Sequence, residues 1–324
     1  MRKWLDAINA HVEKIRYPDL TIFTSTFYRY NENTSIENQD VVRSNLAIKT
    51  IENANKLWIH LVVLDGWSCE DFLSKIRKFL NITIIEADDT NNIKSLSMWE
   101  ARRMALEIAR EKYNTDFYLW MEPEKDNLIT KENIDPLMQE ARTEKHEIII
   151  PKRKNKASYP DFQAREETRA NKELSSLMYK YTNKNWDTKE WNTKEYNAYD
   201  GEEYDLFFWP KLFSKKVIDY FLSYKSTLDK SDAIITPILI AHQNWVSVWS
   251  KEIDYTYDIT QKENEESSPK IKSINKKWKN RNRKIIDTKR LEQYVYILEE
   301  TKKQLKIKQK IKSELWHILS NKEE

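Results

Sequence analysis

The scarcity of glycine limits what this chain can fold into more than any other feature of its sequence. Only Gly66 and Gly201 occur among its 324 residues, although average usage of about 7% would give more than twenty. Phosphate-binding loops of the GxGxxG and GxxxxGKS/T types need several glycines, because backbone amides must approach the phosphates closely. Neither kind of loop can form here, so a bound nucleotide would have to be recognised in another way.

The first half of the chain alternates strand-like with helix-like segments. We predict strands at 20–26, 58–64, 81–86 and 116–121, with helices at 35–56, 71–79 and 97–112 between them. Segment 58–64 is nearly all apolar, as expected for a strand that a parallel sheet buries on both faces. This order predicts an α/β fold with a doubly wound, mostly parallel sheet. Ligands bind at the carboxyl ends of such strands, which here are 28–32, 65–68, 87–89 and 122–126.

The second half of the chain has a weaker pattern. We predict a strand at 147–151, a helix at 215–224, a buried segment at 233–241 and a strand at 245–249. Residues 183–209 carry aromatic side chains at a spacing that fits neither a helix nor a strand. We interpret this stretch as a long loop, and loops of such length are commonly lids or binding loops. Together the segments predict one domain over 1–258.

The C-terminal part of the chain is basic. Residues 270–319 contain sixteen Lys or Arg and five Asp or Glu, a net charge of +11, whereas the whole chain carries +3. We predict a basic, helical C-terminal extension over 259–324, with one long helix at 289–319. Two interpretations stay open: the helix lies on an anionic membrane surface, or it packs on the preceding domain. The apolar positions that either surface would cover are Leu298, Leu305, Ile311, Leu315 and Ile318. Nucleic acid is not expected as a partner.

The cysteine content and the apolar runs bear on location. Cys69 is the only cysteine, so no internal disulfide forms and the fold needs no oxidising compartment. The longest apolar runs, 58–64 and 233–241, are far shorter than the roughly 20 residues that span a bilayer. We therefore expect a cytoplasmic protein, with peripheral membrane contact through the basic extension as the alternative.

Asp65 stands directly after the apolar strand and before Gly66, which we expect to form a tight turn. A carboxylate at a strand end can accept hydrogen bonds from the ribose or the base of a nucleotide. The same carboxylate can instead cap the helix that follows. The sequence favours neither role over the other.

Glu122, Glu124 and Asp126 follow the predicted strand 116–121 at alternate positions. Alternate side chains of an extended chain share a face, so the three acids would project together, and Pro123 would stiffen the turn. Carboxylate oxygens and substrate phosphates commonly hold Mg²⁺ or Mn²⁺ between them. The pattern predicts a divalent-metal site, and the alternative is three solvated acids in a surface loop.

Four motifs in this order carry a resemblance to a known family. Residues 28–32 (YRYNE) resemble a P-x-Y-N-E that ends a first strand, and 63–68 (VLDGWS) resemble a V-D-D-G-S nucleotide-contact strand. Residues 98–106 resemble a G-x-x-x-A-R-x-x-A-L helix, and 117–124 stand where a metal-binding Asp-x-Asp would follow the fourth strand. Over about 20–215, the chain resembles GT-A-type glycosyltransferases, near the family 2 and glucosyl-phosphoglycerate-synthase-like groups.

The resemblance implies a GT-A-like fold and a nucleotide-sugar site. The donor would contact Tyr28, Tyr30, Asn31, Glu32, Asp65 and Arg102, and Mn²⁺ or Mg²⁺ would be held by Glu122, Glu124, Asp126 and Asp258. Two departures from the family pattern affect the metal. Glu-Pro-Glu replaces Asp-x-Asp, and a tyrosine, Tyr257, stands where relatives place a late histidine ligand, so either Asp258 substitutes for it or that ligand is missing.

Two further groups of polar residues are candidates for the site. Gln163 and Glu166 follow the strand predicted at 147–151 and either contact the donor sugar or the acceptor, or belong to a helix N-terminus. Residues 200–205 resemble the acidic region that supplies the catalytic base in inverting members of the family. Glu203 or Asp205 would then take the proton of the acceptor hydroxyl.

We therefore expect a glycosyltransferase that moves a sugar from a nucleotide-diphosphate-sugar donor to an acceptor hydroxyl with a divalent metal. One alternative is a catalytically inactive nucleotide-sugar-binding relative, favoured by the Glu-Pro-Glu and by the missing histidine. The other is a nucleotidyltransferase, which shares the sheet but needs a glycine-rich first loop that this sequence lacks.

Overall fold

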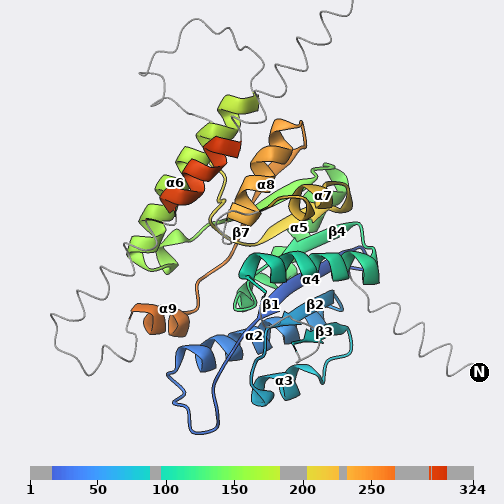
Figure 1. The fold of residues 1–324 in the computed structure, drawn as a ribbon, viewed down its shortest axis with the longest axis vertical. Helices are drawn as coiled ribbons and strands as arrows, with labels where there is room; N and C mark the ends of the chain where they lie inside the picture. Colours follow the sequence, from blue (N-terminus) through green and yellow to red (C-terminus); the bar gives the residue numbers. More distant parts are fainter. Residues whose placement is uncertain are drawn as a thin grey trace, which may run out of the picture.

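The computed structural model describes residues 17–87, 96–182, 203–225, 232–266, 292 and 294–304. These residues form a seven-stranded sheet with helices on both faces (Figure 1). The strands are β1 (Leu20–Thr26), β2 (His60–Asp65), β3 (Ile82–Glu86), β4 (Phe117–Trp120), β5 (Ile148–Arg153), β6 (Lys211–Ser214) and β7 (Val248–Ile253). The helices are α2 (Gln39–Lys56), α3 (Glu70–Ile76), α4 (Met98–Tyr113), α5 (Lys131–Thr143), α6 (Asp161–Thr182), α7 (Ile218–Leu222), α8 (Asp232–Gln243) and α9 (Ile259–Glu266).

The sheet confirms the predicted α/β fold with a doubly wound, mostly parallel sheet. The strand order is β3-β2-β1-β4-β6-β5-β7, and neighbouring strands are parallel except where β6 pairs with β4 and β5. The chain runs from β1 outwards to β3 and then returns to β4 on the other side of β1. This reversal of direction places a topological switch point between β1 and β4, where open α/β sheets commonly bind ligands.

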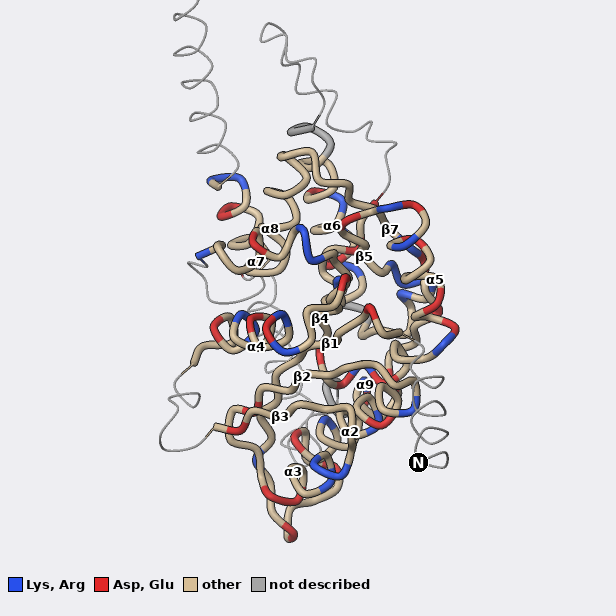
Figure 2. The backbone as a smooth tube through the Cα atoms, turned by 90° about the vertical axis from the view of Figure 1, so that its right-hand side faces the viewer, with Lys and Arg blue, Asp and Glu red and all other residues tan. Residues whose placement is uncertain are grey.

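Alternation along the strands explains why both faces of the sheet are covered. Val62 and Leu64 of β2 belong to one buried cluster, and Leu61 and Val63 belong to the other, as the two-residue period of a strand requires. Helices α4, α6, α7 and α8 cover the first face, and α2, α3 and α5 cover the second. In side view, α4 lies on one side of β1, β2 and β4, and α2 lies on the other (Figure 2).

Local sequence signals set the ends of the helices near the strand ends. Ser97 caps α4 in a capping box with Glu100, and Asn114 ends the helix in a left-handed conformation with φ 45°, which asparagine tolerates better than most residues. Asn38 caps α2 by accepting a hydrogen bond from the Asp40 amide. These caps fix where both helices meet the loops after β1 and β3.

Strand β6 and helix α5 were not predicted, and α6 was predicted only as one of two interpretations of the polar cluster at its start. Strand β6 has only four residues, and all of them are buried, including Lys211; a charged residue in a sequence normally indicates the surface. Helix α5 contains Pro136, which is normally a signal that ends a helix. The first turn of α6 coincides with the polar cluster that we had considered either as a binding region or as a helix N-terminus.

The described part of the predicted basic extension packs on the same core as the rest of the chain. Helix α9 contacts α2, and residues 294–304 form a helical segment beside α6 (Figure 1). Ile297 is fully buried, the Tyr294 ring lies 4.6 Å from that of Phe207, and the Thr301 hydroxyl lies 3.1 Å from that of Thr236 on α8. Leu298 packs against the same cluster, so protein covers this face of the helix.

The remaining apolar positions of the predicted long helix, Leu305, Ile311, Leu315 and Ile318, lie outside the described residues. None of the helices that the structure describes has the length and apolar character needed to cross a membrane.

Candidate functional site

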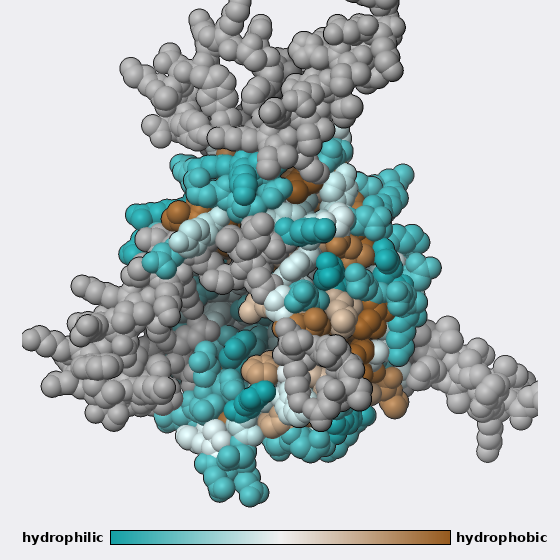
Figure 3. Space-filling view, in the orientation of Figure 1, coloured by the Kyte–Doolittle hydropathy of each residue, from teal (hydrophilic) through white to brown (hydrophobic). Residues whose placement is uncertain are grey.

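Two cavities open at the carboxyl ends of the parallel strands. The strand-end cavity, of about 690 Å³, lies between the ends of β1 and β4 and is lined by residues of both strands and of α2 and α4. The turn cavity, of about 750 Å³, lies beside the turn between β2 and α3. Figure 3 shows a hollow near the centre of the face seen in Figure 1, with mainly hydrophilic residues below it. Because the strand-end cavity lies between β1 and β4, it stands at the switch point of the sheet.

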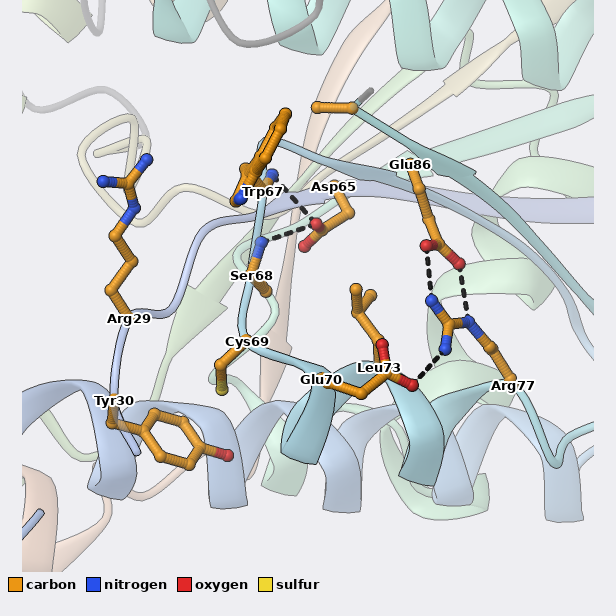
Figure 4. A pocket seen from close by; sticks show the side chains of 11 residues that line it. Arg29, Tyr30, Asp65, Trp67, Ser68, Cys69, Glu70, Leu73, Arg77 and Glu86 are labelled. Carbon is orange, nitrogen blue, oxygen red and sulfur yellow. Dashed lines mark hydrogen bonds and ion pairs between the residues drawn. The ribbon is translucent and has the colours of Figure 1, made fainter. Parts of the chain in front are cut away.

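Asp65 holds the turn that borders the turn cavity. Its Oδ1 accepts a hydrogen bond from Thr26 Oγ1 at 2.7 Å, and its Oδ2 accepts from the amides of Trp67 and Ser68 at 2.9 and 2.7 Å (Figure 4). The Asp65 side chain is completely buried. This geometry does not cap α3, which begins after its N-cap residue Cys69; the carboxylate is instead satisfied within its own turn.

Trp67, and not Gly66, takes the left-handed conformation in this turn. Its φ is 90°, whereas the φ of Gly66 is not positive; Gly66 serves the turn by allowing a close approach, since a Cβ there would lie 3.3 Å from Phe27 Cδ2. A positive φ is costly for a bulky residue, and such strain is typically found at functional sites. The turn places the indole, 36% exposed, beside Asp65 and Ser68 in the wall of the turn cavity (Figure 4).

Arg29 is a second exposed group of the turn cavity. Its guanidinium carbon lies 4.8 Å from the centre of the Phe27 ring, and it forms no ion pair with another described residue. Arg77, in the same cavity, is instead held by Glu86 and Glu70 (Figure 4). An incoming anion can therefore bind Arg29 in the turn cavity without first displacing a carboxylate.

Tyr28 and Glu124 form a buried pair in the wall of the strand-end cavity. The Tyr28 hydroxyl donates to Glu124 Oε1 at 2.9 Å, and Arg43 Nη2 from α2 lies 2.6 Å from the same oxygen. Burial, together with the neighbouring carboxylate, raises the pKa of Tyr28 well above its usual value. The phenol thus stays protonated, and Glu124 is held by a hydrogen bond and by an ion pair.

Glu122 faces a lysine that an aromatic cage surrounds. Lys125 Nζ lies 3.3 Å from Glu122 Oε2 and 4.7 Å from the ring centre of Tyr257, with Tyr159 and Tyr255 at 5.8 and 5.9 Å. Burial by itself would lower the pKa of Lys125, but Glu122 and the three surrounding tyrosines together shift it upwards. Lys125 is therefore a permanent cation next to the strand-end cavity.

Asp126 and Asp258 do not line the strand-end cavity. Asp126 begins a short 3-10 helix, η2 (Asp126–Leu128), that packs on α2, and burial raises the pKa of its carboxyl. Asp258 precedes α9 and accepts a hydrogen bond from the Gln261 amide at 3.0 Å. Its carboxylate therefore caps a helix.

The four acids predicted to hold a metal are thus not gathered around one point. Glu122 and Glu124 line the cavity and carry protein cations, while Asp126 and Asp258 lie elsewhere. No group of three His, Cys, Asp or Glu side chains within the described ranges has a geometry suited to a metal ion. These donors do not fit the divalent cation that the sequence pattern predicted.

Tyr30, Asn31 and Glu32 lie in the loop after β1, outside the strand-end cavity. The Tyr30 hydroxyl donates to Asp71 Oδ2 at 3.0 Å and its ring lines the turn cavity, while Asn31 caps its own turn by accepting from the Asn33 amide. Burial raises the pKa of Tyr30. Glu32 is exposed. Of these three predicted donor contacts, the structure brings only Tyr30 to a cavity.

Arg102 projects from α4 between two indole rings. Its guanidinium carbon lies 4.7 Å from the ring centre of Trp120 and 5.6 Å from that of Trp209, and Nη2 lies 2.9 Å from Met98 Sδ. Arg102, Trp120 and Trp209 all line the strand-end cavity. The structure therefore brings Arg102 and Tyr28 to one site, as the sequence predicted.

Asp205 lies in a buried network rather than in a cavity. It accepts from Arg153 Nε and Nη2, both at 2.7 Å, and from Asn171 Nδ2 at 2.8 Å, while Glu167 binds the same guanidinium at 2.8 Å. Burial would raise the pKa of Asp205, but Arg153 outweighs it and lowers the pKa. A carboxylate so fully engaged has a structural role, and we do not assign the acceptor proton to it.

The other candidates from the sequence also have protein partners. Glu203 forms an ion pair with Lys156 at 2.9 Å, Gln163 donates to Glu167 at 2.7 Å, and Glu166 accepts from Arg165 at 2.9 Å. These three residues line neither the strand-end cavity nor the turn cavity.

Sequence reasoning missed several residues that the structure brings to the site, among them Arg29, Lys125, Trp67 and Arg43. Lys125 stands between two of the predicted metal ligands, and alternation along an extended chain would place it on the opposite face from them. Trp67 lies inside a quoted motif, and its left-handed φ is visible only in the folded turn. Arg43 comes from α2, and no local signal relates it to the loop after β4.

No protein-family model matches the chain, and a search of curated proteins found no relative. Solved structures do show similarity. A protein from Desulfovibrio desulfuricans assigned to the nucleotide-diphospho-sugar transferases is 10% identical, with 84% of this chain and 97% of that chain covered and a TM-score of 0.44.

Two further solved structures are similar to a comparable degree. One is glucosyl-3-phosphoglycerate synthase from Mycobacterium tuberculosis in complex with Mn²⁺, uridine diphosphate and glucosyl-3-phosphoglycerate. It is 8% identical, with 80% of this chain and 81% of that chain covered and a TM-score of 0.44. The other is the 4-diphosphocytidyl-2C-methyl-D-erythritol synthase from Anaerococcus prevotii. It is 13% identical, with 78% of this chain and 95% of that chain covered and a TM-score of 0.37. None of these likenesses bears on the chemistry of the site.

Proposed function

We propose that this protein binds a nucleoside-diphosphate sugar at the carboxyl ends of β1, β2 and β4 and transfers the sugar to an acceptor hydroxyl. The observation that carries the proposal is the strained Asp65–Ser68 turn. It holds an exposed indole, that of Trp67, in a cavity that also contains the guanidinium of Arg29, which pairs with none of the described carboxylates. An aromatic face beside a cation suits a nucleobase and its phosphates.

The strand-end cavity would take the diphosphate and the sugar. Arg43 and Arg102 both line it, and Arg side chains bind phosphate oxygens through paired N–H groups. When the bond between the sugar and the diphosphate breaks, negative charge develops on the leaving diphosphate. Fixed guanidinium groups at that position stabilise the charge as it develops. Asp65 would contribute indirectly, by holding the turn that carries Trp67.

A catalytically inactive, nucleotide-sugar-binding relative is the second candidate. The ion pairs on Glu122 and Glu124 favour it, because both acids of the motif after β4 are occupied by protein cations. Incubation with the donor that binds best, followed by measurement of released nucleoside diphosphate, separates the two. Release that is absent with every acceptor tested would favour the binding-only protein.

The test of the binding site compares two tryptophans of similar conformation. Trp67 and Trp245 are both exposed and both have a positive φ, but Trp245 precedes β7 at the amino end of the strands. Isothermal calorimetry with uridine, guanosine, adenosine and cytidine diphosphates first identifies the nucleotide that binds. Because stacking of a base on an aromatic ring contributes roughly 1–3 kcal/mol, Trp67→Ala should raise its Kd by roughly 5- to 150-fold.

Trp245→Ala is the matched control and should leave the Kd unchanged. Trp67→Phe retains an aromatic face and should bind more tightly than Trp67→Ala. If none of the four diphosphates binds, or if the two alanine variants weaken binding equally, the proposed site is wrong.

A further inference from the structure

The two acids after β4 each hold a cation that the chain itself supplies. Arg43 Nη2 lies 2.6 Å from Glu124 Oε1, and Lys125 Nζ lies 3.3 Å from Glu122 Oε2. A divalent ion at this place would need oxygen atoms of the same carboxylates. It would also stand next to two positive charges in a poorly hydrated setting, where repulsion between like charges is strong.

Lys125 is fixed at this position by packing as well as by charge. Its side chain is only 6% exposed, and the rings of Tyr159, Tyr255 and Tyr257 surround the ammonium group. Cation–π contacts of this kind are stronger when the cation is desolvated. Displacing Lys125 to make room for a metal ion would therefore remove a buried cation from its aromatic cage.

Arg43 reaches both Glu124 and the strand-end cavity. Its side chain is 39% exposed and lines the cavity, while Glu124 is 3% exposed. A guanidinium has five N–H donors in a planar fork. One nitrogen contacts Glu124, so donors on the other nitrogens can bind the oxygens of a phosphate group.

We propose that Arg43 and Lys125 take the place of a divalent cation at this site, so that a nucleoside diphosphate binds without metal. Arg43 would contact the diphosphate directly, and Lys125 would neutralise Glu122, which otherwise repels the phosphates. The inference rests on the proposed function, since it concerns the same ligand in the same cavity. It differs from the metal site that the sequence predicted.

Calorimetry with the tightest-binding of the four diphosphates tests the proposal directly. We expect the same Kd within a factor of about two in EDTA and in Mn²⁺ or Mg²⁺. Arg43→Gln should raise the Kd in EDTA at least tenfold, as expected for loss of a charged hydrogen bond to phosphate. Arg110→Gln is the matched control, because Arg110 pairs with Asp219 on the surface, away from both cavities. Binding that requires Mn²⁺ overturns the inference and leaves the proposed function intact.

A second measurement needs no nucleotide. Titration of Mn²⁺, followed by electron paramagnetic resonance, should show no stoichiometric site in the wild-type protein. A site that is present and is lost in Glu122→Gln or Glu124→Gln overturns the inference. Arg43→Gln combined with Lys125→Met frees both carboxylates, so the double variant should bind Mn²⁺ more tightly than the wild type. Circular dichroism and thermal melting establish that each variant is folded, and Lys125→Arg, which keeps the charge, should behave as the wild type in this titration.

Discussion

Replacing Asp205 by alanine separates a structural role from a catalytic one. The carboxylate accepts two hydrogen bonds from the Arg153 side chain at 2.7 Å, one from the Arg153 amide at 3.3 Å and one from Asn171 at 2.8 Å. Asp205 and Arg153 are both almost completely inaccessible to solvent. Asp205→Ala leaves Arg153 with Glu167 as its remaining described carboxylate partner.

The size of the effect follows from this burial. Removing one partner of a buried ion pair costs about 3–5 kcal/mol; here Glu167 still binds Arg153, but the donors of Arg153 and Asn171 that contacted Asp205 lose their buried acceptor. Such a loss is a large part of the roughly 5–15 kcal/mol that stabilises a typical domain. We therefore expect Asp205→Ala to lower the free energy of unfolding by about 3–5 kcal/mol.

Urea unfolding followed by tryptophan fluorescence measures this loss. Glu203→Ala is the matched control, since Glu203 lies two residues away in the sequence and its ion pair with Lys156 is 34% and 26% exposed. A partly exposed pair contributes about 0–1 kcal/mol. If Asp205→Ala loses less than about 1 kcal/mol, as Glu203→Ala is expected to do, the buried network does not stabilise the fold and our account of Asp205 is refuted.

Two further predictions concern Lys211 and the C-terminal helical segment. Burial lowers the pKa of Lys211 from 10.5 to about 7, so between these values the unfolded chain binds a proton that the folded protein does not. Above pH 7, the free energy of unfolding of the wild type should therefore rise by roughly 1.4 kcal/mol per pH unit relative to that of Lys211→Met. Urea titrations at several pH values measure both free energies, and a constant difference between the two proteins would contradict this prediction. Ile297→Ala should lower the free energy of unfolding by about 2–5 kcal/mol, because the side chain is fully buried. Val295→Ala, half exposed on the same segment, should change it by less than about 0.5 kcal/mol, and equal urea midpoints for the two variants would show that the segment does not pack on the core.

The sequence by itself predicted the parallel half of the fold well. Strand β1 was predicted over its full length, and β2, β3 and β4 were predicted within two residues of their observed ends. These strands are buried on both faces and are separated by amphipathic helices. The spacing of apolar residues within each segment therefore indicates whether that segment is a strand or a helix. The same pattern indicated the carboxyl ends of these strands as the ligand-binding edge, whereas the switch point between β1 and β4 follows from the strand order of the folded sheet.

Only the tertiary structure decided which charged groups of the site are available. The sequence placed Glu122, Glu124 and Asp126 together because alternate residues of a strand share a face, but the chain turns after Trp120, so Glu122 and Glu124 line the strand-end cavity and Asp126 does not. It also offered Asp65 as a ligand contact, whereas the folded turn uses its carboxylate internally. Arg43 and Lys125 became part of the site through contacts between α2, the loop after β4 and the tyrosines that surround Lys125. Whether a carboxylate is free depends on which cation lies within a few ångströms of it, and such distances are set by packing between segments remote in the sequence.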